Sequence, residues 1–397
     1  MKYTNPKKAS ILWISFFQAR GLDRSSLSNI LNQLAKLGHE VSLVTMQDKI
    51  ETTKNTQVRI ISIPLRRTPL VLPAIFAFIL FFYLPILTTT SKTDFIIMEP
   101  SVHILSAFPQ LVLSKFRKVK FILDIRSTPV ETEGLRGSLL KFWFSVSILT
   151  AKKKFRGITI ITPLMKEKVC NDYGLDPDKV GVWTSGVSDT LFNPETWISE
   201  GAKLKERLRL HGKFVVFYHG VFTPTRGLIE TAEAVRALRS RYPDIVFFLL
   251  GSGPLFSKLG TLVQEEGLQE NVIVANPVDH SEVPKYISMS NVGIVPLPDH
   301  PYWRMQSPLK LLEYLAMEKV AILTNLPAHR AVTGDEKCGI YLSSVNPTKI
   351  AEKIEYAYLN RPYLTEWGKV GRQIVKQRYT WEKVADSLET YLQSIDN

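Results

Sequence analysis

The chain has 397 residues, of which 45% are hydrophobic and 22% charged. This is enough material for two domains with proper cores, and it excludes an intrinsically disordered protein. A net charge of +13 favours an anionic partner such as a phosphorylated substrate or anionic lipid. The basic residues are scattered without a recognition module, so no nucleic acid partner is expected. Cys170 and Cys338 form no metal-ligand pattern, which predicts reduced thiols in a cytoplasmic protein.

The opening residues predict a strand, a helix and a second strand. Residues 11–14 form a continuous apolar run, as in a strand buried on both faces. Apolar residues then recur at helical spacing over 27–37, Gly38 stands where a helix cap belongs, and 41–45 return as a strand. This βαβ unit is the building block of a doubly wound parallel sheet.

Residues 70–87 carry no charge and just reach the length of a membrane-spanning helix, about 17–25 residues. Because 95–98 predict another strand of the same domain, a span would divide one sheet between the two sides of the bilayer. We expect a helix packed partly on the sheet and partly dipped into the membrane interface, with basic residues in 115–120 and 152–156 beside it. A purely buried core helix is the alternative.

The alternation of strands and helices restarts at Phe214, which predicts a second Rossmann-like half. Its expected strands are 214–218, 245–250, 272–274 and 292–295. We therefore expect an α/β protein with the following parts: an N-terminal domain over 1–187, a linker over 188–212, a C-terminal domain over 213–375, and a closing helix over 376–397.

Ligands of such sheets bind beyond the carboxyl ends of the strands, where glycine-rich loops meet helix N-termini. Gly21 ends the first such loop, and residues 220–227 form its counterpart in the second half. Within that loop Gly220 allows close backbone approach, and Arg226 can pair with phosphate oxygens. An ordinary turn is the alternative for each glycine.

A third candidate is the helix predicted over 307–316. Ser307 is a natural N-cap and Pro308 a natural first helical residue, so the helix start suits a diphosphate. Lys310 and Glu313 are three residues apart and share a face. They predict a cation for phosphate and a carboxylate for sugar hydroxyls; a surface ion pair is an equal alternative.

Residues 176–178 have the Asp-x-Asp form of a known metal-binding motif. They lie between a helix stop and a strand, so we expect a turn. No metal and no cofactor are expected.

With these residues, and over nearly its whole length, the sequence resembles the family 4 glycosyltransferases, retaining enzymes of the GT-B architecture. The family-like blocks, in order, are 37–41, 186–194, 218–227, 250–254, 283–296, 307–316 and 378–382. The resemblance implies two Rossmann-like domains facing a cleft, with a donor diphosphate touched by Gly21, Gly220 and Arg226. It also implies that Glu313 holds the donor ribose, and that the closing helix crosses back to the N-terminal domain.

The chain departs from the family pattern at several positions. The first Glu of the family's Glu-x7-Glu motif falls at Met305, and the family's Arg and Lys of the phosphate loop are Val221 and Arg226. Arg126 lies near the place where relatives carry a His that faces the reacting sugar, so the resemblance implies catalytic roles for Arg126 and Glu313. Lys310 then takes over phosphate neutralisation.

We expect a hexosyltransferase that uses a nucleotide-sugar donor and a glycan or lipid-linked acceptor in cell-surface polysaccharide synthesis, with retention. We expect the protein in the cytoplasm. Peripheral binding to an anionic membrane surface, at the inner face of the plasma membrane, is an open alternative. A nucleotide-sugar 2-epimerase of the same fold and a non-catalytic GT-B subunit are the rival functions. Met305 argues against the epimerase, because it removes one carboxylate that such an enzyme would need beside the sugar. The same loss of a Glu keeps the non-catalytic subunit open.

Overall fold

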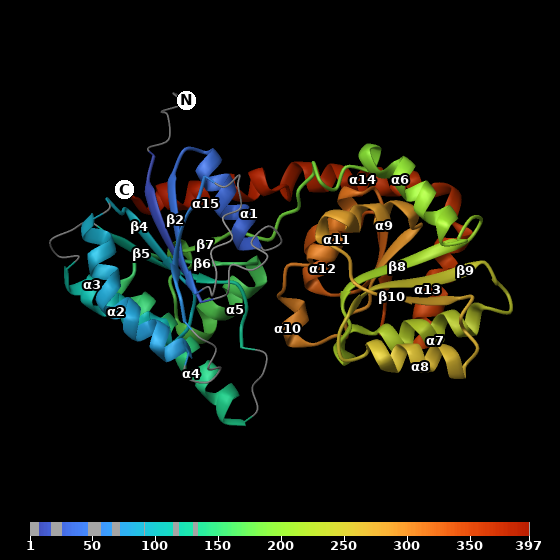
Figure 1. Cartoon of the computed structure of the whole chain (residues 1–397), viewed down its shortest axis with the longest axis horizontal. Coiled ribbons are helices and arrows are strands. Elements are labelled where there is room, and N and C mark those ends of the chain that lie inside the picture. Colours follow the sequence, from blue (N-terminus) through green and yellow to red (C-terminus); the bar gives the residue numbers. More distant parts are fainter. Residues whose placement is uncertain are drawn as a thin grey trace. The chain divides into compact units, whose positions relative to one another are not determined.

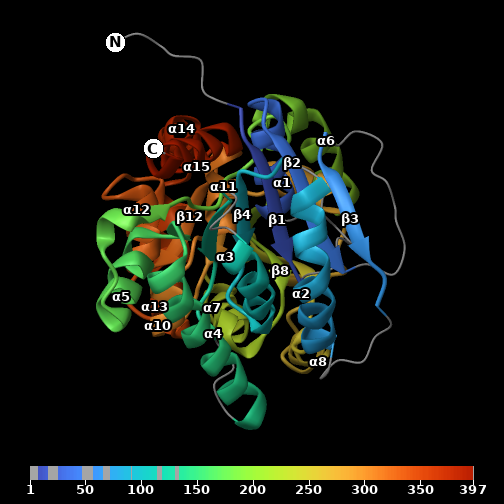
Figure 2. The ribbon, with the colours of Figure 1, turned by 90° about the vertical axis from the view of Figure 1, so that its left-hand side faces the viewer.

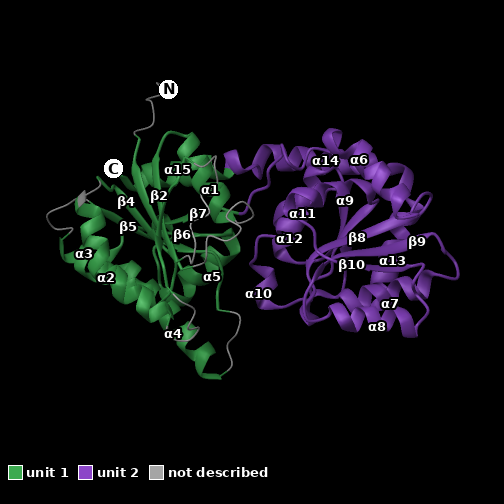
Figure 3. Cartoon of the chain, in the orientation of Figure 1, with its two compact units in different colours: residues 1–184, 384–397 green, residues 185–383 purple. Residues whose placement is uncertain are grey.

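The structure, a computed structural model, describes residues 8–16, 26–46, 57–65, 72–90, 92–113, 119–129 and 134–396. The chain forms two compact units, one of residues 1–184 with 384–397 and the other of residues 185–383 (Figure 3). Each unit is built around a parallel sheet with helices packed on it (Figure 1). The expected α/β class with two doubly wound sheets is therefore confirmed.

The sheet of unit 1 has the strand order β3-β2-β1-β4-β5-β6-β7, with every described pair parallel. Its strands are β1 (Ser10–Ser15), β2 (Glu40–Met46), β3 (Arg59–Ile63), β4 (Phe95–Met98), β5 (Lys120–Ile125), β6 (Gly157–Ile160) and β7 (Val180–Val182). After β1 the chain adds β2 and β3 on one side, then crosses over and adds β4 to β7 on the other, so the switch point lies between β1 and β4. That switch point is where loops diverge and a ligand can reach the carboxyl ends of the strands.

Helices join the strands of unit 1 and cover its sheet. They are α1 (Ser26–Lys36), α2 (Leu72–Thr90), η2 (Val102–Ser106), α3 (Ala107–Leu113), α4 (Gly134–Lys154), α5 (Pro163–Tyr173), η3 (Pro177–Lys179) and the C-terminal α15 (Trp381–Asp396). Asp176 caps η3 by accepting a hydrogen bond from the Asp178 N–H. The expectation of a turn at this Asp-x-Asp sequence is thus confirmed.

Helix α2 has one face in the core and another in solvent. Phe76, Leu80 and Leu84 are fully buried, whereas Phe78 and Phe82 are 67% and 59% exposed. The alternative of a purely buried core helix is therefore wrong. The helix is long and apolar enough to cross a membrane by length and composition, but its buried face already belongs to the fold of unit 1.

The sheet of unit 2 has the order β10-β9-β8-β11-β12-β13, again parallel throughout its described pairs. Its strands are β8 (Phe214–Val221), β9 (Ile245–Ser252), β10 (Val272–Ala275), β11 (Val292–Val295), β12 (Val320–Thr324) and β13 (Gly339–Leu342). Its helices are α6 (Pro194–Arg207), η4 (Pro224–Arg226), α7 (Leu228–Leu238), α8 (Phe256–Glu265), η5 (His280–Glu282), α9 (Val283–Met289), α10 (Pro301–Arg304), α11 (Leu309–Ala316), α12 (Pro327–Thr333), α13 (Pro347–Leu359), η6 (Arg361–Tyr363) and α14 (Leu364–Arg378).

Alternate residues of β8 enter two different core layers. Phe214, Val216 and Tyr218 pack with apolar side chains of α7, α8 and α13. Val215 and Phe217 pack with those of α6, α9 and α11. Because side chains of a strand point alternately to the two sides of a sheet, a continuous apolar strand is buried on both. The result is a three-layer unit whose central strands carry the functional loops at their carboxyl ends.

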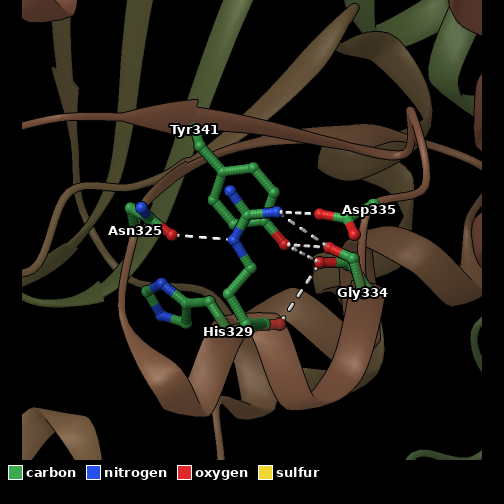
Figure 4. A network of polar contacts seen from close by, with 7 residues as sticks. Asn325, His329, Gly334, Asp335 and Tyr341 are labelled. Atoms are coloured by element: carbon green, nitrogen blue, oxygen red, sulfur yellow. Dashed lines mark hydrogen bonds and ion pairs between the residues drawn. The ribbon is translucent and has the colours of Figure 1, made fainter.

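Arg330 of α12 joins the segment that follows β12, through Asn325, to the segment that precedes β13, through Asp335 (Figure 4). Its guanidinium group donates hydrogen bonds to Asn325 Oδ1 at 2.7 Å and Asp335 Oδ1 at 2.6 Å, and it stacks 3.6 Å from the Tyr341 ring centroid. The Tyr341 hydroxyl in turn donates to the Gly334 carbonyl at 2.8 Å. This network therefore fixes the short helix α12 between β12 and β13.

The division of the chain differs from the expected one. Unit 2 begins at residue 185, and the expected linker over 188–212 includes helix α6, whose Leu204 side chain is buried in the core of unit 2. Helix α6 begins at Pro194 and buries only Gly201 and Leu204 among its 14 residues, so its sequence resembles a polar connection. Residues 384–397, most of the closing helix, belong to unit 1.

The closing helix α15 packs on unit 1 through Tyr391. Its hydroxyl accepts a hydrogen bond from the Ile158 N–H at 3.0 Å and donates one to the Lys179 carbonyl at 2.7 Å. Its ring lies where a side chain at Gly181 would be: a Cβ built there would stand 2.5 Å from the ring. The absence of a side chain at Gly181 therefore makes room for the closing helix.

We predict that Gly181→Ala lowers the free energy of unfolding by about 1–3 kcal/mol through overpacking, and that Tyr391→Ala lowers it by about 2–4 kcal/mol through lost packing. The double variant should be no less stable than Tyr391→Ala, because the clash disappears with the ring. Urea unfolding of all four proteins measures this. Additive losses in the double variant would contradict the described packing.

Candidate functional site

The switch point of unit 2 lies between β8 and β11, and polar residues gather where β8 ends. His219 and Gly220 occupy the end of this strand, and the loop to α7 follows at once. Helix α11, on the crossover from β11 to β12, lies beside the same strand end through Glu313. Gly220, Arg226, Ser307, Lys310 and Glu313, which the sequence predicts as donor-binding residues, all belong to unit 2. Gly21 lies outside the described residues.

Glu313 is a buried carboxylate held by two histidines. Its Oε1 lies 2.7 Å from His280 Nε2, and its Oε2 lies 3.1 Å from His219 Nε2. The His219 ring stacks on Phe217 and meets Tyr314 edge-on, which limits its rotation. The alternative of a surface ion pair between Lys310 and Glu313 is wrong, since the two histidines are the salt-bridge partners of Glu313 among the described residues.

Burial favours the neutral form of Glu313, but the two histidines outweigh it and lower the pKa of Glu313 to about 2. Burial lowers the pKa of His219. At neutral pH the site therefore holds an ionised carboxylate. Each carboxylate oxygen has two lone pairs, so hydrogen-bonding capacity for a ligand hydroxyl remains beside both histidines.

Lys310 lies directly over Gly220. A Cβ at Gly220 would stand 2.8 Å from Lys310 Cε and 3.0 Å from its Nζ. Gly220 also has φ +117°, a conformation that favours glycine. The ammonium group lies 5.4 Å from the Tyr218 ring centroid. Glycine at 220 thus serves two purposes: it allows the turn, and it leaves the path of the lysine side chain open.

Arg226 supplies a second positive charge close to the first. Its guanidinium carbon stacks 4.4 Å from the ring centroid of Trp303, and its Nε is buried without a hydrogen-bond partner among the described residues. Burial and the neighbouring Arg226 charge lower the pKa of Lys310 to about 8. Neither cation forms a salt bridge with any described residue. Two adjacent, incompletely satisfied cations fit an anion with several oxygens.

The loop that carries Arg226 is fixed by its last glycine. Gly227 has φ +63°, and a Cβ there would stand 2.3 Å from the Pro296 carbonyl at the end of β11. The chain therefore passes close to the switch point before α7 begins. The N-cap position of α7 is Gly227 itself, with no side-chain cap, so the first N–H groups of the helix face the loop.

Helix α11 starts one residue later than expected. Its N-cap is Pro308 and its first helical residue is Leu309, so Ser307 does not cap it. Ser307 instead accepts a hydrogen bond on its Oγ from the Ser185 N–H at 3.2 Å. The expectation failed because the proline takes ψ 83°, which is outside the helical region. Met305 is buried, so an apolar side chain stands where the resemblance places a carboxylate.

Unit 1 carries a separate charged cluster at its own switch point. Glu99 directly follows β4, and its Oε1 accepts a hydrogen bond from the Ser15 hydroxyl of β1 at 3.0 Å. Arg126 directly follows β5, the next strand in the sheet. Charge interactions join Arg126 to Glu99 and to Asp124. The three ionisable groups therefore converge on the edge where ligands of parallel sheets bind.

Trp183 positions Arg126 within this cluster. The guanidinium carbon lies 3.4 Å from the indole ring centroid, and Nη1 donates to the Trp183 carbonyl at 2.7 Å. The indole N–H donates to Asp124 Oδ1 at 2.8 Å, and Thr159 donates to the same oxygen at 2.6 Å. Arg126 Nη2 is buried and has no hydrogen-bond partner among the described residues. The two N–H donors of Nη2 thus remain for a ligand.

Burial dominates the titration of this cluster. It raises the pKa of Glu99 to about 7 and raises the pKa of Asp124, and it lowers the pKa of Arg126 to about 10. Glu99 can therefore exchange a proton near neutral pH. Such a group, next to a cation with a free donor, suits contact with a hydroxyl that loses its proton during a reaction.

Sequence reasoning missed several residues of these sites, among them His219, Glu99 and His280. His219 stands at the end of a buried strand beside a loop glycine, and Glu99 follows another buried strand, so both positions carried a usable signal. His280 lies on η5, far along the chain from Glu313, with no pattern that connects them. Only the folded chain brings that pair together.

Two family models match most of the chain between them. The model for "Glycosyl transferases group 1" matches residues 201–374, and the model for "Glycosyltransferase Family 4" matches residues 25–191. The first match contains every residue of the unit 2 site named above except Ser185, and the second contains Glu99, Asp124 and Arg126.

Curated relatives match part of the chain. A Bacillus subtilis protein named as a glycosyltransferase of teichuronic acid biosynthesis, TuaH, is 40% identical over 173 residues, which cover 43% of this chain and 41% of that protein. YtcC of the same organism, also named as a glycosyltransferase, is 24% identical over 252 residues, or 60% of each chain. The matched part therefore spans 60% or less of these relatives.

Solved structures match nearly the whole chain. A glycosyltransferase from Rickettsia africae aligns with a TM-score of 0.77 at 16% identity and covers 98% of this chain and 99% of its own. Anabaena HepE in complex with UDP aligns with a TM-score of 0.71 at 12% identity and covers 98% of this chain and all of its own. With the two parallel sheets, these likenesses confirm the expected GT-B fold.

We predict that Lys310→Met increases the stability of the protein at neutral pH. A lysine with a lowered folded pKa destabilises the fold while it is charged, and this cost is relieved as pH rises from about 8 towards the unfolded value. The gain should be about 1–3 kcal/mol at neutral pH, should shrink as pH rises above about 8, and should be largely gone near pH 10. Thermal or urea unfolding measures it, with the exposed Lys369→Met as the matched control. Equal effects of the two substitutions would contradict the described environment.

Proposed function

The chain belongs to the family 4 type of glycosyltransferases and has the GT-B fold, and from this premise we propose that it transfers a hexose-type sugar from a nucleotide-sugar donor to a glycan or lipid-linked acceptor. One observation carries the proposal. The cations Lys310 and Arg226 stand together without a carboxylate partner among the described residues, beside the ionised Glu313 at the switch point of unit 2.

The three residues match the parts of a nucleoside diphosphate. Arg226 and Lys310 take the two phosphates, and the uncapped start of α7 adds backbone N–H groups. Glu313 accepts hydrogen bonds from the ribose hydroxyls, in the orientation that His219 and His280 impose on its carboxylate. The histidines act on the donor through Glu313, so we assign them a positioning role.

The chemical step needs stabilisation of a departing diphosphate. The bond between the anomeric carbon and the diphosphate oxygen breaks, and the acceptor hydroxyl oxygen forms the new bond. In a front-side attack that retains the anomeric configuration, the hydroxyl proton passes to the departing diphosphate. Lys310 and Arg226 neutralise the charge that develops there, so the proposed reaction needs no metal ion.

The donor base is a matter for direct test. Among the structural neighbours, HepE is described in complexes with UDP and with UDP-glucose. One curated relative from Mycobacterium tuberculosis is named as a GDP-mannose-dependent mannosyltransferase. We propose a thermal-shift panel of UDP, GDP, ADP and dTDP, because a ligand that binds only the folded state raises its melting temperature.

For the acceptor we propose a contact in unit 1. Arg126 Nη2 has a free donor and Glu99 titrates near neutral pH. Both groups suit a sugar or lipid-linked hydroxyl. The name of the relative TuaH refers to teichuronic acid biosynthesis, and it supports an acceptor within cell-surface polysaccharide synthesis.

We predict that Lys310→Met lowers kcat/KM for transfer about 100-fold or more through lost charge stabilisation, whereas Lys310→Arg keeps most of the activity. Glu313→Gln should raise the donor KM about tenfold or more, the cost of a weakened hydrogen bond to a charged group. Activity should persist in EDTA. The measurement is release of the nucleoside diphosphate in the presence of acceptor, with NMR of the anomeric proton in the product.

Three outcomes would contradict the proposal. Epimerised donor formed without acceptor would identify the nucleotide-sugar 2-epimerase. Donor binding without transfer or hydrolysis, over a broad acceptor panel, would identify the non-catalytic subunit. An inverted anomeric configuration would refute the retaining step while leaving the donor site in place.

A further inference from the structure

The exposed apolar side chains of the protein are concentrated on one group of helices in unit 1. Among the described residues, 15 large apolar side chains that are exposed lie on α2, η2, α3 and α4, against seven in all other elements. They are Ile75, Phe78, Phe81, Phe82, Tyr83, Ile86, Leu105, Phe108, Val112, Leu113, Leu135, Leu139, Leu140, Phe142 and Leu149. Monomeric soluble proteins rarely expose such a set together.

These elements adjoin one another in the fold. Segment η2 contacts both α2 and α4. Helix α3 lies beside α2 (Figures 1 and 2). The Gln110 side chain of α3 donates a hydrogen bond to the Thr88 hydroxyl of α2, which joins these two helices by a buried contact. We call the exposed side of α2, η2, α3 and α4 the apolar face.

The apolar face is an outer surface of a folded unit and not a membrane span. In α2 the side chains of Phe76, Leu80 and Leu84 are fully buried against unit 1. Removing the helix from the sheet would expose these side chains, at about 1.5–3 kcal/mol for each large one. The helix keeps its place, and only the side with Phe78, Phe82 and Ile86 is left for a partner.

The charge on the apolar face has one sign. Over the described residues of α2, η2, α3 and α4 there is no Asp or Glu, whereas α4 carries Arg136, Lys141 and three lysines over 152–154. The lysines at 152–154 are exposed and end the helix. Exposed apolar side chains on helices whose charged residues are all cationic are typical of surfaces that bind anionic lipid.

We propose that the apolar face docks unit 1 on an anionic lipid bilayer, with α2 lying in the membrane interface and α4 placing its lysines among the lipid head groups. Phe78, Phe82 and Ile86 enter the boundary between head groups and acyl chains. The fold of unit 1 stays intact. An enzyme held this way meets a lipid-linked acceptor at the membrane surface, but the docking itself does not depend on the proposed transfer.

Charge argues against a second copy of the chain as the occupant. A symmetric dimer brings the same patch of each subunit together, so the cations of one apolar face would meet those of the other. Like charges in such a contact are repulsive. An anionic bilayer satisfies the apolar and the basic parts of the face at once.

The test is flotation of the full chain with vesicles, without donor or acceptor. Vesicles of phosphatidylcholine with phosphatidylglycerol are compared with phosphatidylcholine alone, at low and high salt. We expect binding to the anionic vesicles that weakens as salt screens the lysines. The double variants Phe78→Gln/Phe82→Gln and Lys153→Gln/Lys154→Gln should each reduce the partition coefficient about tenfold or more, since each buried aromatic or surface lysine contributes about 1 kcal/mol or more.

Matched variants on unit 2 control for general loss of charge or apolar surface. Ile198 and Leu359 are 64% and 60% exposed there, so Ile198→Gln/Leu359→Gln should bind as the wild type does. Lys369→Gln/Lys376→Gln, at exposed positions of α14, is the control for charge. Circular dichroism of every variant confirms folding.

Depth is measured at position 82. The native Cys170 and Cys338 are buried, so a cysteine in Phe82→Cys can be labelled selectively with a polarity-sensitive dye. Vesicle lipids brominated near the head-group end of the acyl chain should quench the dye more than lipids brominated near the bilayer centre. Strongest quenching from the centre would overturn the interfacial placement.

Equal flotation of the face and control variants, or no binding to anionic vesicles, would overturn the docking surface. A dimer that dissociates in Phe78→Gln/Phe82→Gln would assign the face to self-association instead.

Discussion

Two like charges held side by side are the constraint around which unit 2 is organised. Burial disfavours the charged form of Lys310, and the positive charge of Arg226 repels it. Both effects lower the pKa of Lys310. A protein that needed only stability would place a carboxylate between them or an apolar side chain at one of them. The nearby Glu313 does not fill this role, because His219 and His280 hold its carboxylate.

Several local features make sense only in relation to this pair. Gly220 leaves space for the lysine stem, Gly227 brings the arginine loop against the end of β11, and Trp303 supports the guanidinium group from one side. The sheet order places β8 and β11 next to each other, so the strand end and the crossover helix α11 contribute to one site. Unit 1 repeats the arrangement with Glu99 and Arg126 at its own switch point. Both units thus place charged residues at the carboxyl edge of a parallel sheet: two cations and a carboxylate in unit 2, and Arg126 with Glu99 in unit 1.

Much of this could be predicted from the sequence because the strands are buried on both faces. Continuous apolar runs such as 214–218 are typical of strands in the middle of a parallel sheet, and the restart of the pattern predicts two sheets. The helical spacing of Lys310 and Glu313 predicts that they lie on one face of a helix. The partner of Glu313 could not be predicted, since His280 reaches it through the tertiary fold. The predicted helix start at Ser307 was wrong because Pro308, with ψ 83°, lies outside the helical region and delays the helix by one residue. The domain boundary was misplaced because α6 carries too few apolar residues to be distinguished from a linker. For α2, composition alone could not separate the buried side of the helix from the exposed one.

The most direct test of the account is hydrogen exchange of backbone amides with and without a nucleoside diphosphate, the one that stabilises the protein most in a thermal-shift panel. The account predicts slower exchange in two segments of unit 2, residues 220–230 and 307–313, and little change on the rest of its sheet. Bound nucleotide that leaves both segments unchanged, with protection elsewhere, would contradict the central claim that Lys310, Arg226 and Glu313 form the donor site.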